Sequence, residues 1–76
     1  MNRQGSADRL RAELTQVEQE IESVRKTAAD IRSGVGDAED PADRGALIQA
    51  ADEQDGVADQ LTARRDDLIR RIAEAS

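Results

Sequence analysis

The sequence contains no cysteine, no histidine and no aromatic residue, and only one proline among its 76 residues. Without cysteine and histidine it can form neither a disulfide framework nor a zinc site of the usual kind. Without phenylalanine, tyrosine or tryptophan, and with 13 alanines among its apolar residues, it can bury only a small core. Chains this short commonly need a disulfide, a metal or a partner chain to be stable. We therefore expect at most one domain, stabilised by a partner chain.

Long apolar runs are also absent, and the charges are unbalanced. The longest apolar runs, such as Ala46–Ile48, have three residues, so neither a membrane span nor a signal peptide is predicted. Seventeen acidic residues against 11 basic ones give a net charge of -6, which opposes direct binding to nucleic acid. Ten arginines against one lysine are typical of a GC-rich bacterial genome. We expect a bacterial, cytoplasmic protein that contacts neither membrane nor nucleic acid directly.

The side chains that most often carry out catalysis are scarce. Nucleophilic and acid–base catalysis commonly use cysteine, histidine, or a serine beside a base in a concave pocket. The four serines fall at predicted helix ends (Ser6, Ser33), on a polar helix face (Ser23) and at the last position (Ser76). The sequence therefore predicts a protein that is not an enzyme and that holds no cofactor or metal.

The first half of the chain has apolar residues at alternating spacings of three and four. Four unbroken heptads of this kind indicate a helix with one apolar seam, over about residues 7–35. Ser6 is the expected N-cap, with Asp8 in the first turn. Gly34 and Gly36 can adopt the left-handed conformation that ends helices. The seam residues are Ala7, Leu10, Leu14, Val17, Ile21, Val24, Ala28, Ile31 and Val35.

The second helix has a sharper start. Asp40 can cap the free N–H groups, Pro41 suits the first helical position, and Asp43 lies three residues after the cap. The predicted helix covers about residues 41–75, after a turn of about residues 36–40. Its seam consists of Leu47, Ala51, Ala58, Leu61, Leu68, Ile72 and Ala75, and it is flanked by Ile48, Val57 and Ile69. The wider apolar stripe predicts that this helix meets more than one neighbour.

Three residues interrupt the pattern of the second helix. Gln54 and Arg65 are polar residues in seam positions, where such residues usually fix register or oligomeric state. Gly56 lowers helix stability by about 1 kcal/mol relative to alanine. A glycine in mid-helix is explained most simply by a close helix contact or a bend, and we expect one of these at Gly56.

The short turn requires the chain to return antiparallel to itself. The predicted fold is therefore all-α, a single antiparallel helical hairpin that dimerises to a four-helix bundle. Two registers keep the seams in contact: one places Leu14 opposite Leu61, and the other, shifted by a heptad, places Ile21 there. The pattern favours neither register. A chain that folds only on its partner is the alternative, supported by the high charge fraction and opposed by the unbroken heptads.

Acidic residues gather around the turn, opposed only by Arg44. The candidate acidic tip consists of Asp37, Glu39, Asp40 and Asp43. In the structural interpretation, Asp40 and Asp43 stabilise the start of the second helix and the other two keep the turn hydrated. In the functional interpretation, the tip contacts a partner. The spacing does not match a calcium-binding EF-hand loop, because the twelfth position counted from Asp37 is Ile48.

Two short stretches resemble bacterial factors that enter the secondary channel of RNA polymerase. Residues 50–56, Ala-Ala-Asp-Glu-Gln-Asp-Gly, are similar to the Ala-Ala-x-Glu-Gln-x-Gly stretch on the second hairpin helix of Gre transcript-cleavage factors. Residues 40–44, Asp-Pro-Ala-Asp-Arg, are similar to the Asp-Pro-x-Asp-Arg tip of DksA/TraR-type factors. The resemblance implies a coiled-coil hairpin whose Asp40 and Asp43 approach Mg²⁺ in the polymerase. The second domain of these families has no counterpart in the 76 residues.

The sequence therefore favours a non-enzymatic helical hairpin that associates with itself and acts as an interaction or regulatory module. The expected partners are a second copy of the chain and another protein with a basic surface. The alternative is a transcription regulator that inserts its acidic tip into the secondary channel of RNA polymerase.

Overall fold

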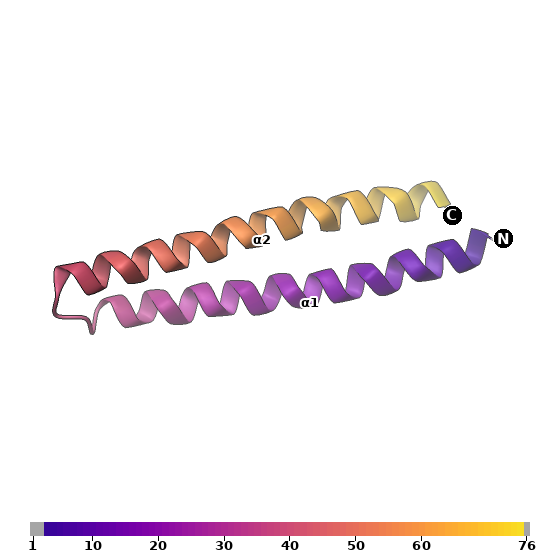
Figure 1. Ribbon diagram of the computed structural model, residues 1–76. Coiled ribbons are helices and arrows are strands. Elements are labelled where there is room, and N and C mark those ends of the chain that lie inside the picture. The colour runs from indigo at the N-terminus through magenta and orange to yellow at the C-terminus, as the bar shows by residue number, and fades with distance from the viewer. Residues whose placement is uncertain (1–2, 76) are drawn as a thin grey trace.

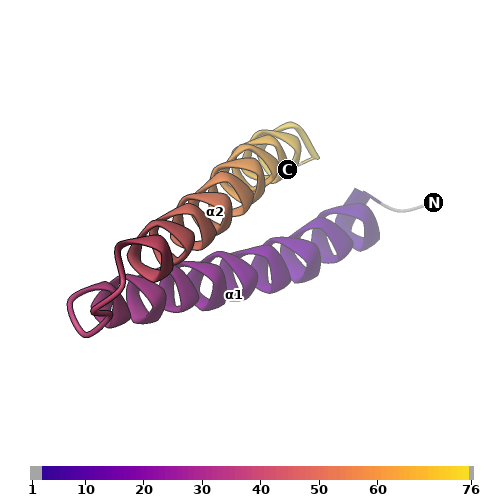
Figure 2. The ribbon, with the colours of Figure 1, turned by 60° about the vertical axis from the view of Figure 1, so that its left-hand side comes forward.

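The structure, a computed structural model, describes residues 3–75 and contains two long helices. Helices α1 (Arg3–Val35) and α2 (Pro41–Ala75) run antiparallel, side by side, and are joined at one end by the turn at residues 36–40 (Figure 1). A second view shows the turn in front with both helices running back from it (Figure 2). The molecule is a rod with extents of 59 × 14 × 14 Å. The predicted all-α helical hairpin is confirmed.

Helix α1 begins earlier than its apolar pattern predicts. It starts at Arg3, so the predicted cap at Ser6 is wrong: Ser6 lies within the helix, and Asp8 lies beyond the first turn. Asp8 instead accepts a hydrogen bond from Arg11, one turn further on, at 3.3 Å. No proline precedes Ala7, and each residue added to an existing helix gains a backbone hydrogen bond. The helix therefore extends past its first seam residue.

The end of α1 also differs from the prediction. No glycine among the described residues has a positive φ, so the left-handed ending expected at Gly34 or Gly36 is wrong. The Asp37 N–H donates to the Gly34 carbonyl at 3.2 Å. The Ala38 N–H donates to the Val35 carbonyl at 3.3 Å. These tight turns satisfy two carbonyls at the helix end without a left-handed residue.

Helix α2 starts at Pro41, as the sequence predicts. The Ala42 N–H donates to Asp40 Oδ1 at 2.9 Å, and the Arg44 N–H donates to the Asp40 carbonyl at 3.0 Å. Asp40 is therefore the N-cap, and Pro41 occupies the first helical position, where its missing N–H leaves no bond unmade. Asp43 lies in the first turn, where the helix dipole favours an acidic residue.

The apolar seams of the two helices meet along the rod and form a thin core. Its buried members among the described residues are Ala7, Val17, Ile21, Ala28, Ala51, Ala58 and Leu68. Leu68 is the one large side chain in that part of the chain that is fully buried, and it clusters with Val17 and Ile21. Most of the other buried residues are alanines, so the core contains little apolar volume.

The cluster around Leu68 identifies the register of the hairpin. If Leu14 lay opposite Leu61, then Leu68 would lie about 15 Å along the rod from the level of Val17. In the register that places Ile21 opposite Leu61, the same offset is about 5 Å, one helical turn. Since Val17 and Leu68 belong to one cluster, the structure has the second register.

Gly56 does not mark a close contact within the hairpin. It lies on the exposed surface of α2, and a Cβ built on it meets no heavy atom within 4 Å. The close helix contact predicted there is therefore wrong for the single chain. The helix continues through Gly56 without interruption.

Candidate functional site

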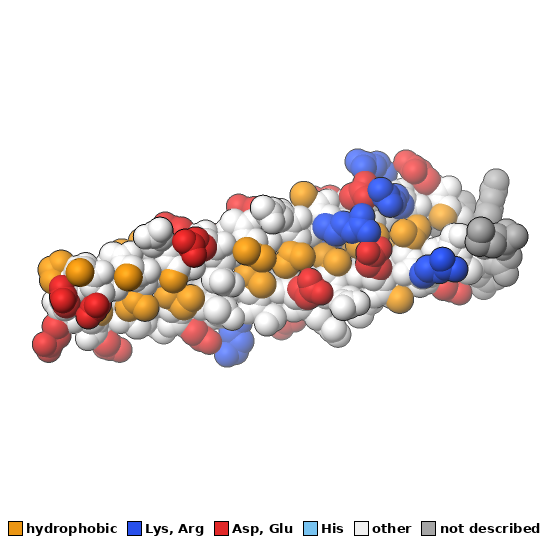
Figure 3. All heavy atoms as spheres, viewed as in Figure 1, with side chains coloured by type: hydrophobic (Ala, Val, Ile, Leu, Met, Phe, Trp, Pro, Cys, Tyr) orange, Lys and Arg blue, Asp and Glu red, His pale blue; other side chains and the backbone are white. Residues whose placement is uncertain are grey.

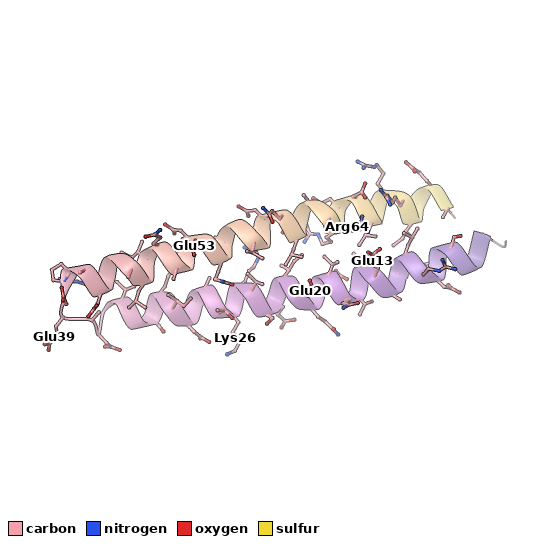
Figure 4. The ribbon with its side chains drawn as sticks, viewed as in Figure 1. Glu13, Glu20, Lys26, Glu39, Glu53 and Arg64 are labelled. Carbon is pink, nitrogen blue, oxygen red and sulfur yellow. The ribbon has the colours of Figure 1, made fainter. Side chains whose placement is uncertain are left out.

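The acidic tip lies at the exposed end of the rod. Its four carboxylate side chains are exposed, and the labelled Glu39 projects away from both helices (Figure 4). One oxygen of Asp40 is engaged in the cap of α2, at 2.9 Å from the Ala42 nitrogen. Within residues 3–75, no group of three or more carboxylates is arranged to hold a metal ion. The structure therefore supports the capping role of Asp40, and contact of the tip with a partner stays a prediction.

The predicted seam residues lie together between the helices. All eleven large ones are buried or half-buried: Leu10, Leu14, Val17, Ile21, Val24, Ile31, Val35, Leu47, Leu61, Leu68 and Ile72. The polar seam residue Arg65 is half-buried, and its guanidinium donates to Asp66 Oδ1 at 3.0 and 3.1 Å. Its long aliphatic stem lets the charge reach the surface from a seam position.

Arg32 joins the two helices near the turn. Its Nη2 atom donates to Asp52 Oδ1 at 3.0 Å and to Asp55 Oδ2. The bond to Asp55 raises the pKa of Arg32, and the same bond lowers the pKa of Asp55 below its ordinary value. One heptad earlier in α1, Arg25 donates to Thr62, one heptad later in α2, at 3.5 Å. Polar contacts thus follow one side of the seam at heptad intervals.

Glu13 and Arg64 join the helices on the other side of the seam. Arg64 lies nine residues after Asp55, about two and a half helical turns. Its Nη2 donates to Glu13 Oε1 at 2.7 Å, and the two side chains point toward each other (Figure 4). That hydrogen bond raises the pKa of Arg64. Asp67 forms ion pairs with Arg64, Arg70 and Arg71. The arginines near the end of α2 are therefore held in ion pairs with acidic residues.

Charge is distributed unevenly along the rod. Residues 25–55, which form the turn end, contain eight acidic and four basic residues. Residues 5–16 and 63–75, which form the other end, contain five acidic and six basic residues. On the face shown in Figure 3, basic side chains gather toward the chain ends and acidic ones surround the turn. The rod therefore has an acidic end and a weakly basic end.

Three large apolar side chains of α2 are exposed: Ile48 (47%), Val57 (42%) and Ile69 (49%). Ile48 and Ile69 are 21 residues apart, about six turns of a supercoiled helix, so they lie on the same side of α2. Val57 lies about two and a half turns after Ile48, on the opposite side. Asp55 and Thr62 complete a row at heptad spacing between the two isoleucines. This side of the hairpin, with the polar contacts to Asp55 and Thr62, is named the Ile48–Ile69 face.

A shallow hollow of about 360 Å³ lies between the helices on the Ile48–Ile69 face. It is lined by Glu18, Ile21, Glu22, Arg25 and Arg65. A second hollow of about 320 Å³, near the chain ends, is lined by Ser6, Arg9, Leu10, Glu13 and Arg71. Both hollows combine one apolar seam residue with charged residues of both signs. Such a lining is suited to a charged protein surface.

The ion pairs across the seam are the contacts that sequence analysis missed. Arg32 and Asp55 each follow a seam position, whereas Glu13 and Arg64 each precede one. Residues that flank the seam in this way commonly contact each other across a helix pair, so their positions could have predicted contacts of this kind. The identity of each partner depends on the register, which the heptad pattern leaves open.

Comparison with known proteins finds no matching family model, and no curated protein or solved structure that is significantly similar to the chain. The resemblance of residues 40–44 and 50–56 to secondary-channel factors therefore stays a prediction. Within residues 3–75, no helix is both long enough and apolar enough to cross a membrane.

Proposed function

We propose that the chain is a non-enzymatic interaction module that works as a dimer, in which two hairpins associate into a four-helix bundle. The observation that carries this proposal is the large accessible surface of the single hairpin, 5445 Å². A compact monomer of 8.3 kDa is expected to expose about 4600 Å². The excess, roughly 850 Å², is close to the area of about 800 Å² that each partner buries in an interface of standard size.

The thin core supports the same proposal. Leu68 is the only large side chain of the described residues that is fully shielded, while Ile48 and Ile69 are about half exposed. A second hairpin supplies the missing layer and covers apolar surface that two helices cannot cover for each other. In this proposal, association both stabilises each hairpin and forms the four-helix module.

The test of this proposal is the mass of the protein in solution. Multi-angle light scattering should report twice the chain mass of 8.3 kDa. The melting temperature should rise with protein concentration, because a dimer that unfolds to single chains is stabilised by mass action. The chain has no aromatic residue, so its concentration is best measured by refractive index. A monomer with a concentration-independent melting temperature contradicts the proposal.

The acidic tip is the surface that we assign to a second partner, a protein with a basic surface. Its exposure at the end of a 59 Å rod supports this assignment. The same observation favours a second candidate function, in which the tip enters the secondary channel of RNA polymerase and Asp40 and Asp43 approach the bound Mg²⁺. The effect of the chain on transcription by purified RNA polymerase distinguishes the two functions.

A further inference from the structure

We propose, on the basis of the dimer proposed above, that two copies meet through the Ile48–Ile69 face and lie antiparallel. Ile48 of each copy then packs against Ile69 of the second copy. The occupant of the face is thus another copy of this chain, and the turn of one hairpin lies toward the chain ends of the other.

The positions of the exposed isoleucines select this face. A two-fold interface requires that if one residue contacts another, the reverse contact is also made. Ile48 and Ile69, exposed to 47% and 49%, meet this requirement when the axis lies midway between them. They are separated by about 31 Å along α2, so the contact extends along most of the helix. The opposite side of α2 has a single exposed residue of this kind, Val57.

The chemistry of α1 selects the antiparallel orientation. When two hairpins pack face to face with their turns together, α2 of one copy lies over α1 of the other. By the register of the hairpin, Ile48 then lies near the level of Arg32 of α1, and Ile69 near the level of Arg11. When the turns point in opposite directions, α2 lies over α2, and the isoleucines face each other. Apolar side chains are better buried against apolar ones than against charges, whose desolvation is costly.

The same axis also pairs opposite charges. An axis midway between Ile48 and Ile69 places Asp52 opposite Arg65 of the second copy. The register of the hairpin continues the axis into α1, where Glu22 lies opposite Arg25 of the second copy. Glu22, Arg25 and Arg65 all line the hollow on this face, which the second copy covers.

The charge of the whole rod leads to the same orientation. With the turns together, the eight acidic and four basic residues of each turn end lie beside the same set in the second copy. Like charges placed side by side across an interface oppose association. In the antiparallel orientation each acidic end lies toward the weakly basic end of the other rod, where five acidic residues accompany six basic ones.

Cross-linking of single-cysteine variants tests the face and the orientation. The chain has no cysteine, and cysteine behaves as a small apolar residue, so Ile48→Cys and Ile69→Cys change the contact little. A short thiol cross-linker should join the two variants when they are mixed, and should join neither variant to itself. Cross-linking of Ile48→Cys to itself overturns the antiparallel orientation. A Val57→Cys variant that cross-links to itself while the mixture does not overturns the choice of face.

Charge reversal at the axis is an independent test. Glu22→Lys and Arg25→Glu should each weaken the dimer on the order of tenfold, because each places like charges together twice in a two-fold dimer. The double variant restores the opposite charges and should return the dissociation constant to near that of the wild type. Glu20→Lys is the matched control, since Glu20 lies on the side of the seam that contains Glu13 and should leave the dimer unchanged.

The outcomes separate the two proposals. A wild-type chain that is monomeric at every concentration contradicts the dimer itself. A wild-type dimer that tolerates Glu22→Lys, or that fails to regain affinity in the double variant, contradicts only the face and orientation. Far-UV circular dichroism should show the same helix content for every variant that is compared.

Discussion

Arg32 and Asp55 form an ion pair that ties α1 to α2 across 23 residues of sequence. The pair is compatible with only one of the two registers that preserve the seams. In the register observed, Asp55 lies about 8 Å along α2 from the level of Arg32, within reach of the long side chain. In the other register the offset is about 18 Å, which a guanidinium cannot span. The contact therefore fixes the alignment as well as joining the helices.

The same pair predicts how stability depends on pH. The pKa of Asp55 is lowered from its ordinary value of 3.8 by the hydrogen bond from Arg32. A folded-state pKa below the unfolded one adds stability that is fully present above the unfolded pKa and is lost as the pH falls through the folded one. Asp55→Asn should therefore lower the melting temperature at pH 7, and the difference from the wild type should shrink as the pH falls below 3.8 and through the lowered pKa of Asp55. Asp59→Asn, at an exposed position of α2, is the control.

Truncation of the core tests the packing around Leu68. Leu68→Ala should lower the free energy of unfolding by about 2 to 5 kcal/mol, because the side chain is fully buried and its removal leaves a cavity. Val57→Ala removes a side chain that is 42% exposed and should have a much smaller effect. Urea unfolding at one protein concentration compares the two variants. Equal losses would mean that the core is not centred on Leu68.

Gly56 offers a stabilising substitution. A Cβ at this position meets nothing within 4 Å, and Gly56→Ala removes the flexibility of glycine from mid-helix. The free energy of unfolding should rise by about 1 kcal/mol, measured by urea titration, with the dimer mass unchanged. Loss of stability or of the dimer would instead place Gly56 in a close contact between copies, outside the Ile48–Ile69 face.

The cap of α2 can be separated from any other role of Asp40. Asp40→Ala should lower stability by about 1 kcal/mol, because the Ala42 N–H loses its acceptor at 2.9 Å. Asp40→Asn retains an oxygen in the same position and should behave almost as the wild type does. Thermal melts of the three proteins measure this order. Equal stability of the alanine and wild-type proteins would show that the cap contributes nothing.

A transcription assay with the double variant Asp40→Asn/Asp43→Asn tests the second candidate function. Neutral amides are poorer ligands for Mg²⁺ than carboxylates, so the variant should remain folded but lose any effect that depends on an acidic probe. We expect the wild-type chain to leave initiation, pausing and transcript cleavage by purified RNA polymerase unchanged, as an interaction module does. A wild-type effect that the double variant abolishes would favour the secondary-channel function.

Local signals predicted the parts of the fold that local energies decide. The Asp40-Pro41 pair marked the start of α2, because the cap and the missing N–H of proline act on the nearest residues. The heptad spacing of apolar residues likewise predicted both helices. The start of α1 was not predictable from its seam, since Arg3 and the residues after it contain no strong stop signal. At Gly34 glycine permits a left-handed ending without requiring it, and tight turns formed instead.

The register and the flanking ion pairs could not be predicted from the heptad pattern. A shift of seven residues brings apolar positions opposite apolar positions again, so both registers bury comparable seams. Only contacts between distant residues, such as Arg32 with Asp52 at 3.0 Å, distinguish the two. Part of the Ile48–Ile69 face could be predicted, because the sequence identified Ile48 and Ile69 as residues beside the seam. Their exposure to solvent became known from the structure.

Both ends of the chain lie at the same end of the rod, opposite the turn (Figure 1). In an antiparallel pair of hairpins the chain ends of the two copies are therefore at opposite extremes, roughly 60 Å apart by the helical rise. Two domains joined to these ends would be held apart by the length of the bundle. The pair would act as a molecular spacer, whose length is set by the number of heptads.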